Sequence, residues 1–259
     1  MTNENPIGLF DSGIGGTSIW KEVHALMPYE NTIYLADSKN APYGLKSKDE
    51  IVALSCKNTE FLLENNCKII VVACNTATTN AIKELRTKYN VPFIGIEPAI
   101  KPAALQSKTQ TIGILATKGT LNSELFHKSV ANHPDVKIIE QIGHGLVQLI
   151  ENGDMESAEM DDLLNSYLNP MIQNNIDYLV LGCSHYPYLI PQIQKIIPSH
   201  IKIIDSGEAV AKQTQKILKQ NHLLNHSNKK GSQIFYTNSE PEVLKNILEN
   251  NENVVYKNF

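Results

Sequence analysis

The sequence is poor in cysteine and tryptophan, with four and one of these residues among 259, and its charges nearly balance. Four cysteines are too few for the disulfide framework of a small secreted scaffold, so each cysteine needs its own explanation. No apolar run approaches the ~20 residues of a membrane-spanning helix, and the first residues lack the basic and apolar regions of a signal peptide. A net charge of −4 gives no basic footprint for nucleic acid. We therefore expect a soluble, cytoplasmic protein with neither a membrane nor a nucleic-acid partner.

The overall composition is that of an ordinary globular protein. Apolar residues make up 42% of the chain and charged residues 19%, which argues against disorder and fibrous repeats. The length suits either one large α/β domain or two domains of roughly 100–150 residues.

Short apolar segments alternate with longer amphipathic ones along the chain. Continuous apolar runs favour parallel strands that are buried on both faces, and the amphipathic segments favour helices that cover them. This alternation predicts an α/β fold with mainly parallel sheets. The predicted strands are Pro6–Phe10, Thr32–Ala36, Lys68–Ala73, Pro92–Gly95, Thr111–Leu115, Val136–Glu140, Tyr178–Gly182, Ile201–Ile204 and Gln233–Tyr236. The predicted helices are Asp49–Asn65, Thr76–Tyr89, Glu156–Gln173 and Pro241–Glu249, and His222–Gly231 is predicted to be a loop.

A faint internal repeat relates the two halves of the chain. Three apolar strands recur in the same order, 105 to 110 residues apart, and both copies of the third strand end in a small residue, a cysteine and a polar residue. Two similar α/β halves that face each other would place equivalent strand ends across one cleft, where open parallel sheets bind ligands. The matching pairs are Ile7–Ser12 with Ile112–Thr117, Ile70–Asn75 with Leu179–Ser184, and Val91–Ile94 with Ile201–Ile204.

Cys74 follows the third predicted strand and precedes a predicted helix. Asn75 or Thr76 would cap that helix. A thiol beside the free N–H groups of a helix N-terminus has a lowered pKa and can act as a base or a nucleophile. The same N–H groups can bind a carboxylate. The alternative is a buried structural cysteine, which is a common fate for an unpaired thiol.

Cys183 stands in the equivalent context in the second half. Ser184 is a helix-capping residue type, Pro187 suits the first turn of a helix, and His185 could tune the thiol or donate a proton. Two thiols on opposing halves can address opposite faces of one small molecule. This pairing favours a functional interpretation of both cysteines.

The other two cysteines, Cys56 and Cys67, lie away from the carboxyl ends of the predicted strands. We interpret them as packing residues. No Cys-x-x-Cys or His-x-x-x-His spacing occurs, so we expect no metal site.

Three further features flank the expected cleft. Asp11 begins a glycine-rich turn at the end of the first strand, where a carboxylate could accept a substrate ammonium or assist Cys74. The turn matches neither the dinucleotide fingerprint nor the P-loop. Pro42-Tyr43-Gly44 has the composition of a plain turn, and the local pattern makes Glu151 a solvated residue at a helix end.

Four separated segments together resemble the signature segments of the glutamate racemase family, in the right order over essentially the whole chain. The segments are Phe10-Asp11-Ser12-Gly13-Ile14-Gly15-Gly16, Pro42-Tyr43-Gly44, Ala73-Cys74-Asn75-Thr76-Ala77 and Gly182-Cys183-Ser184-His185-Tyr186-Pro187. One departure is Ser184, where the family usually has threonine. Serine keeps the hydroxyl and loses a methyl group.

The resemblance implies cofactor-independent racemisation of glutamate, which would supply D-glutamate for bacterial peptidoglycan. It implies that Cys74 and Cys183 are the two acid/base residues, and that Asp11, His185 and Glu151 assist proton transfer. It also implies two α/β domains, 1–97 with 207–259 and 98–206, with the active site between them, and a homodimer. The implied substrate-contact residues are Asp11, Ser12, Pro42, Tyr43, Gly44, Asn75, Thr76, Ser184 and His185.

Three other functions remain open from the sequence. An aspartate racemase would share the chemistry and differ in its side-chain pocket. A non-catalytic amino-acid-binding protein would also suit two α/β halves around a cleft, but it needs no reactive thiol at both strand ends. A Cys–His hydrolase would need one activated thiol and an orienting third group, and no second matched cysteine.

Overall fold

The computed structural model describes residues 3–249 and 253–259, and its strands form two entirely parallel sheets. The first sheet contains β1 (Ile7–Asp11), β2 (Thr32–Ala36), β3 (Ile69–Val72), β4 (Phe93–Gly95), β9 (Gln233–Thr237) and β10 (Val254–Tyr256), in the spatial order β10-β9-β2-β1-β3-β4. The second sheet contains β5 (Thr111–Ala116), β6 (Lys137–Ile142), β7 (Tyr178–Gly182) and β8 (Lys202–Ile204), in the order β6-β5-β7-β8. We call each sheet with its helices a lobe.

The two sheets share one strand order, which confirms the repeat that the sequence predicts. The order β2-β1-β3-β4 in the first sheet corresponds to β6-β5-β7-β8 in the second. In the first sheet, β1 lies between β2 and β3 and pairs with both. In the second sheet, β5 lies between β6 and β7 in the same way. The equivalent strands β3 and β7 therefore end at equivalent places, and each is followed by one cysteine.

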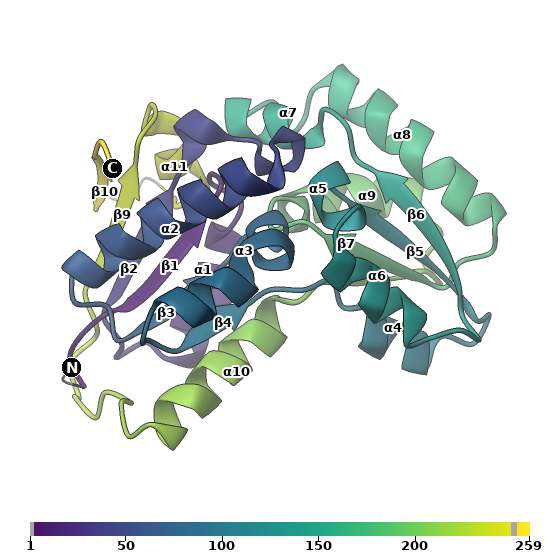
Figure 1. Ribbon diagram of the computed structural model, residues 1–259. Coiled ribbons are helices and arrows are strands. Elements are labelled where there is room, and N and C mark those ends of the chain that lie inside the picture. Colours follow the sequence, from purple (N-terminus) through teal and green to yellow (C-terminus); the bar gives the residue numbers. More distant parts are fainter. Residues whose placement is uncertain (1–2, 250–252) are drawn as a thin grey trace.

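Helices cover both sheets, and α3 and α5 lie between the two lobes (Figure 1). The helices of the first lobe and of the C-terminal segment are α1 (Thr17–Leu26), α2 (Lys48–Glu64), α3 (Asn75–Lys88), α10 (Gly207–Gln220) and α11 (Glu242–Ile247). Those of the second lobe are α4 (Ile100–Gln106), α5 (Lys118–Leu121), α6 (Glu124–Ala131), α7 (Leu146–Asn152), α8 (Ala158–Gln173) and α9 (Ile190–Ile196). Short 3-10 helices are η1 (Ser38–Asn40), η2 (Tyr43–Leu45) and η3 (Tyr186–Leu189).

Side-chain caps fix where several helices begin. Ser47 and Glu50 form a complete capping box at the start of α2, which satisfies two free N–H groups. The Ser157 hydroxyl accepts from the Met160 N–H and starts α8 at residue 158, two residues later than predicted. By contrast, Gly16 gives α1 no side-chain cap, and α1 is absent from the predicted elements.

All nine predicted strands are present, with ends displaced by at most two residues. The sixth strand, expected over Val136–Glu140, runs instead over Lys137–Ile142 because it pairs along the whole length of β5. The three-residue strand β10 is absent from the predicted elements. It pairs with β9 at the edge of the first sheet.

The C-terminal segment returns to the first lobe. Strand β9 pairs with β2 over five residues, and α10 packs against α1. These contacts support the proposed division into 1–97 with 207–259 and 98–206, which we keep as a proposal.

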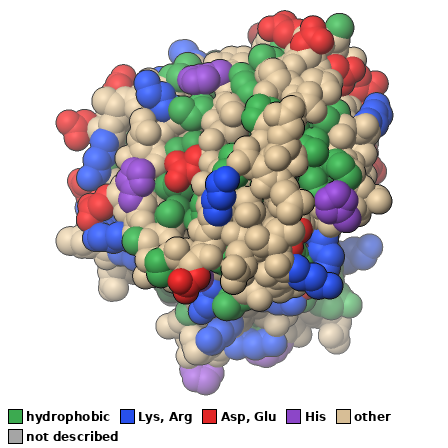
Figure 2. All heavy atoms as spheres, turned by 90° about the vertical axis from the view of Figure 1, so that its right-hand side faces the viewer, with side chains coloured by type: hydrophobic (Ala, Val, Ile, Leu, Met, Phe, Trp, Pro, Cys, Tyr) green, Lys and Arg blue, Asp and Glu red, His purple; other side chains and the backbone are tan. Residues whose placement is uncertain are grey.

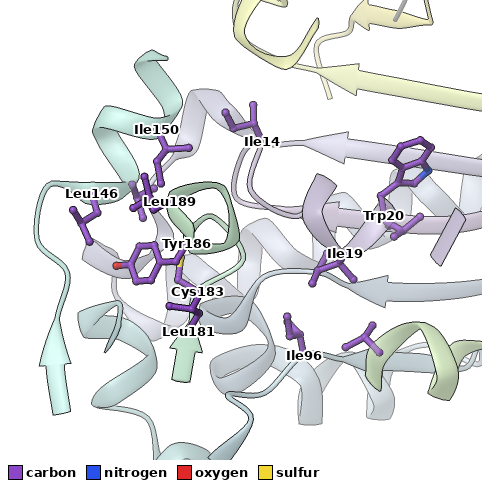
Figure 3. Close-up of a cluster of buried hydrophobic side chains, with 14 of the residues drawn as sticks. Ile14, Ile19, Trp20, Ile96, Leu146, Ile150, Leu181, Cys183, Tyr186 and Leu189 are labelled. Carbon is purple, nitrogen blue, oxygen red and sulfur yellow. The ribbon is translucent and has the colours of Figure 1, made fainter. Parts of the chain in front are cut away.

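One buried apolar cluster extends from the first lobe into the second. Figure 3 shows Ile19, Trp20 and Ile96 on one side and Leu181 and Tyr186 on the other. On the face shown in Figure 2, acidic and basic side chains are interspersed, with one group of acidic side chains at the top. Within the described residues, no helix combines the length and the apolar character needed to cross a bilayer.

Candidate active site

A small cavity lies between the lobes, where β3 and β7 end. Both Cys74 and Cys183 line it, so the structure brings the two predicted thiols together. Of the other predicted residues, only Asp11 and Glu151 do not line the cavity. The lining residues are Ser12, Pro42, Tyr43, Gly44, Cys74, Asn75, Thr76, Thr117, Val147, Cys183, Ser184 and His185.

Cys74 is itself the N-cap of α3, which corrects the expectation that Asn75 or Thr76 would fill that position. Its Sγ accepts from the Ala77 N–H at 3.4 Å and lies 3.7 Å from the Ser12 hydroxyl. The expected lowering of its pKa is wrong for this closed site. Burial, followed by the nearby Asp11 carboxylate, raises the pKa of Cys74 well above its usual value and outweighs the Ala77 hydrogen bond.

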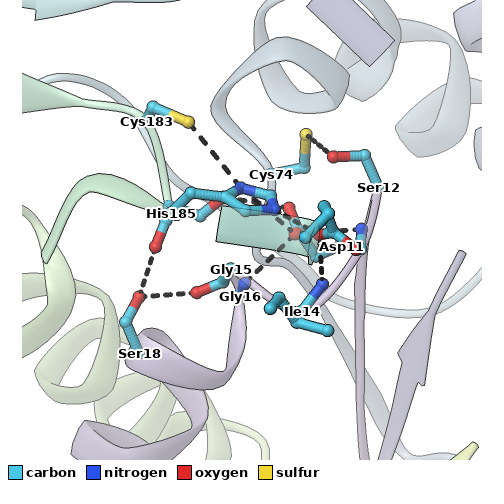
Figure 4. A network of polar contacts seen from close by, with 12 residues as sticks. Asp11, Ser12, Ile14, Gly15, Gly16, Ser18, Cys74, Cys183 and His185 are labelled. Atoms are coloured by element: carbon cyan, nitrogen blue, oxygen red, sulfur yellow. Dashed lines mark hydrogen bonds and ion pairs between the residues drawn. The ribbon is translucent and has the colours of Figure 1, made fainter. Parts of the chain in front are cut away.

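Cys183 directly follows β7, and the helix expected after it is only the short 3-10 helix η3, with Pro187 in its first turn as predicted. The chain turns through residues 183–185 into η3, and α9 begins only at Ile190. Pro191 lacks the N–H that one continuous helix from residue 186 would need at that point, and it lies instead in the first turn of α9. Instead of a helix end, Cys183 has His185, whose Nδ1 lies 3.8 Å from its Sγ. The two thiols therefore have unlike neighbours (Figure 4).

His185 is buried between two carboxylates. Its Nε2 lies 2.5 Å from Glu151 Oε1, and its Nδ1 lies 3.9 Å from Asp11 Oδ2. Burial alone would lower the pKa of His185, but Cys183, Glu151 and Asp11 together raise it well above its usual value. An imidazolium that faces Cys183 is a charge that stabilises a thiolate there.

Asp11 ends β1 beneath the cavity and already accepts several hydrogen bonds. Its Oδ2 accepts from the N–H groups of Gly13 and Gly16, and its Oδ1 accepts from the Ser184 hydroxyl at 3.0 Å. Burial is the largest effect on its carboxyl group and raises the pKa, although His185 opposes it. Serine at position 184 thus keeps the hydroxyl contact, without the methyl group usual in the family.

Glu151 lies against the other lobe, not in solvent as its local pattern suggested. From α7 it accepts from the Ile14 N–H at 2.7 Å, from the Ser38 hydroxyl at 2.8 Å and from His185. Ile14 is 137 positions away in the sequence, so no local pattern could reveal this contact.

The glycine-rich turn is explained by how closely these side chains approach it. A Cβ on Gly13 would lie 1.9 Å from Glu151 Oε1, and one on Gly15 would lie 2.2 Å from His185 Nδ1. Neither glycine has a positive φ, so space rather than backbone conformation requires glycine here.

Two other predicted contact residues differ in whether their polar atoms have hydrogen-bond partners within the protein. The Tyr43 hydroxyl points away from the cavity, donating to Asp37 Oδ2 at 2.5 Å and accepting from Asn58. Asn75 is buried, and both polar atoms of its amide lack a hydrogen-bond partner. Buried unpaired amides are rare and costly, so Asn75 is well placed to bind a polar ligand.

Sequence reasoning missed Thr117, which lines the cavity from the second lobe. Its hydroxyl lies 2.8 Å from that of Thr76, across the cavity. The repeat contained the signal, because Thr117 is the counterpart of Ser12, a predicted contact. Val147, also missed, carries no polar signal.

No group of three or more metal-ligating side chains occurs among residues 3–249 and 253–259.

Comparison with known proteins links this geometry to one family. The profile of the Asp/Glu/hydantoin racemases matches residues 17–214. A curated glutamate racemase of Herpetosiphon aurantiacus is 44% identical over 239 residues, covering 92% of this chain and 94% of that protein.

Solved structures agree over nearly the full length. Glutamate racemase of Francisella tularensis, in complex with D-glutamate, superposes with a TM-score of 0.85 at 28% identity, covering 99% of this chain and 98% of that one. Glutamate racemase of Escherichia coli, in complex with L-glutamate and the activator UDP-MurNAc-Ala, gives 0.86 at 31% identity and 97% coverage of both chains.

Proposed function

The chain belongs to the Asp/Glu/hydantoin racemase family and is an amino-acid racemase, and we propose that it interconverts L- and D-glutamate by two opposed thiols, without a cofactor. One observation carries the two-thiol proposal: Cys74 and Cys183 line the same cavity from equivalent strand ends of the two lobes. The glutamate racemases that match this chain, two of them with bound glutamate, support glutamate as the substrate.

The demanding step is removal of the proton from the substrate Cα, which is a very weak acid. The carbanion-like species that results needs hydrogen-bond donors around the α-carboxylate. Free N–H groups at the start of α3 and the unpaired Asn75 amide can supply them on the Cys74 side. On the Cys183 side, the Ser184 hydroxyl donates to Asp11, so it would have to leave that carboxylate to donate to the substrate.

Proton transfer then uses the two faces of the substrate. One thiolate takes the Cα proton from its face, and the opposite thiol gives its proton to the other face and becomes the thiolate. The reverse reaction exchanges the two roles, so each thiol must be able to act as base and as acid. Asp11 is placed to assist at Cys74, and His185 with Glu151 at Cys183.

The substrate itself changes the charges at Cys74. In the closed site, burial and Asp11 keep that thiol protonated. A substrate ammonium in the cavity next to Cys74 would offset the charge of the Asp11 carboxylate beneath it and favour the Cys74 thiolate. Closure around the substrate also excludes water and strengthens each of these interactions.

The wider role follows from the family resemblance. We propose that the enzyme works in the cytoplasm as a homodimer and that its D-glutamate supplies peptidoglycan synthesis. The proposed mechanism needs both thiols in their reduced form, and the cytoplasm keeps thiols reduced.

Circular dichroism of L-glutamate and L-aspartate, each incubated with the protein, tests the substrate. Loss of the glutamate signal with aspartate unchanged is expected, and the opposite result would assign an aspartate racemase. Cys74→Ala and Cys183→Ala should each abolish racemisation with unaltered unfolding. A variant that racemises at near the wild-type rate would overturn the two-thiol mechanism, and tight binding of glutamate without turnover would favour a binding protein.

A further inference from the structure

Ser38, in η1 of the first lobe, is outside the cavity, yet it contacts the group that faces His185. Its hydroxyl donates to Glu151 Oε2 at 2.8 Å, across the boundary between the lobes. Glu151 Oε1 meanwhile accepts from Ile14 of the first lobe and from His185 of the second. The carboxylate is thus held by two first-lobe donors and directs its remaining contact at His185.

The turn that carries Ser38 is itself rigidly held. The carboxylate of Asp37 accepts from the side-chain amides of Asn40 and Asn238, at 2.7 and 2.5 Å. The side-chain oxygen of Asn238, Oδ1, also accepts from the backbone N–H of Lys39 at 2.9 Å. Asn238 follows β9, so the C-terminal segment fixes the position of the Ser38 hydroxyl.

We propose that Ser38 is a positioning residue for the racemisation, which acts through Glu151 to hold His185 against Cys183 when the lobes are closed. The inference rests on the proposed function and extends it to a residue that does not contact the substrate. Both donors to Glu151 belong to the first lobe and Glu151 to the second, so this alignment of the Cys183 side depends on the two lobes being in contact.

Several charged or titratable groups face His185, and they determine what a change at Ser38 does. These are Glu151 on α7, Asp11 at the end of β1 and Cys183 directly after β7. Cys183 is in turn close enough to Cys74 and Tyr186 to interact with them electrostatically. Loss of the Ser38 hydroxyl frees one oxygen of Glu151 and loosens its hold on His185. The imidazolium beside Cys183 is then less favoured. Cys74 is affected only indirectly, through Asp11 and Cys183, and keeps its contacts with Ala77 and Ser12.

The test compares Ser38→Ala and Ser38→Thr with Tyr188→Phe as a matched control. Tyr188 also bonds across the lobes, to Thr17 at 2.6 Å, but it does not touch Glu151. The rates of iodoacetamide alkylation of Cys183 and Cys74 are followed against pH by peptide mass spectrometry, without substrate. Steady-state kcat and KM for glutamate are measured in parallel.

Ser38→Ala should raise the pH midpoint for Cys183 more than that for Cys74 and lower kcat by about tenfold, as loss of a hydrogen bond to a charged group does. KM should change by less than about twofold. Ser38→Thr should restore both values, and Tyr188→Phe should leave the Cys183 midpoint in place. In a Glu151→Gln background, Ser38→Ala should add no further loss of kcat.

The proposal is overturned if Ser38→Ala keeps the wild-type kcat, if it shifts both thiols equally, or if Tyr188→Phe reproduces its effect. The alkylation profile needs no turnover. A protein that fails to racemise glutamate but shows the selective Cys183 shift would therefore refute the proposed function and leave the Ser38 contact intact.

Discussion

Replacement of Gly15 by alanine is the sharpest test of how the glycine-rich turn supports the site. The new Cβ would lie 2.2 Å from His185 Nδ1 and 2.3 Å from its Cγ, whereas Cβ contacts below 3.0 Å essentially do not occur. The imidazole or the turn must therefore move by about 0.8 Å (3.0 minus 2.2). The obstacle is a buried ring held by Glu151, not the end of a flexible side chain.

A shift of about 1 Å in a catalytic group can cost about 100-fold in rate, and crowding of a packed interior costs about 1–3 kcal/mol of stability. We expect Gly15→Ala to lose about 100-fold in kcat for glutamate, measured by circular dichroism. Urea unfolding should show a loss of about 1–3 kcal/mol, which leaves the protein folded at 25 °C.

Gly207→Ala is the matched control. Its Cβ would lie 3.0 Å from Cγ of the exposed Glu22 side chain, which can move. Position 207 begins α10, and alanine suits a helix better than glycine. Wild-type kcat and stability are expected for this variant. Gly15→Ala with unchanged kcat would refute the inference that His185 is held in place over the turn.

Three further predictions concern Asn75, Lys68 and Asp177. Asn75→Ala should raise the KM for glutamate by about tenfold, as expected for a lost polar contact, without lowering the urea midpoint, because its amide has no hydrogen bond within the protein to lose. An unchanged KM would remove Asn75 from the substrate site. Lys68→Met should leave kcat intact. It should lower the free energy of unfolding in urea by about 3–5 kcal/mol, because the buried Glu30 carboxylate would lose its ionic partner. A neutral result would mean that the pair is dispensable. At Asp177, burial raises the pKa, but hydrogen bonds from Ser107, Lys108 and Thr109 lower it below 3.8 overall. Its stabilisation is therefore present above about pH 4 and lost as pH falls through the folded pKa. Asp177→Asn should flatten that acid limb in melts from pH 7 to pH 3, and an unchanged limb would contradict this.

Much of the fold could be predicted because parallel strands that are buried on both faces appear in the sequence as short runs of apolar residues. The internal repeat also predicted part of the site, since the spacing of its strands places Cys74 and Cys183 at equivalent strand ends. The same repeat relates Thr117 to Ser12, and it therefore carries the signal for the cavity contact that the local motifs around Thr117 do not show.

The remaining features depend on contacts between distant parts of the chain. The pKa of Cys74 reflects burial in the folded chain and the nearby Asp11 carboxylate, which the local helix N-terminus cannot reveal. Glu151 has the pattern of a solvated helix end but lies against Ile14 and Ser38 of the other lobe. At Cys183 the local signals correctly place Pro187 in the first turn of a helix, but they do not reveal that this helix is a short 3-10 element before α9.

The central claim, that two separate thiols exchange protons at the two faces of Cα, is tested most directly by racemisation in deuterated solvent. L-Glutamate and D-glutamate are each incubated with the protein, and the first product is examined by mass spectrometry for deuterium at Cα. The two-thiol account predicts that product formed from either enantiomer carries solvent deuterium, while unreacted substrate keeps its proton. Complete retention of the original proton in the product would contradict it.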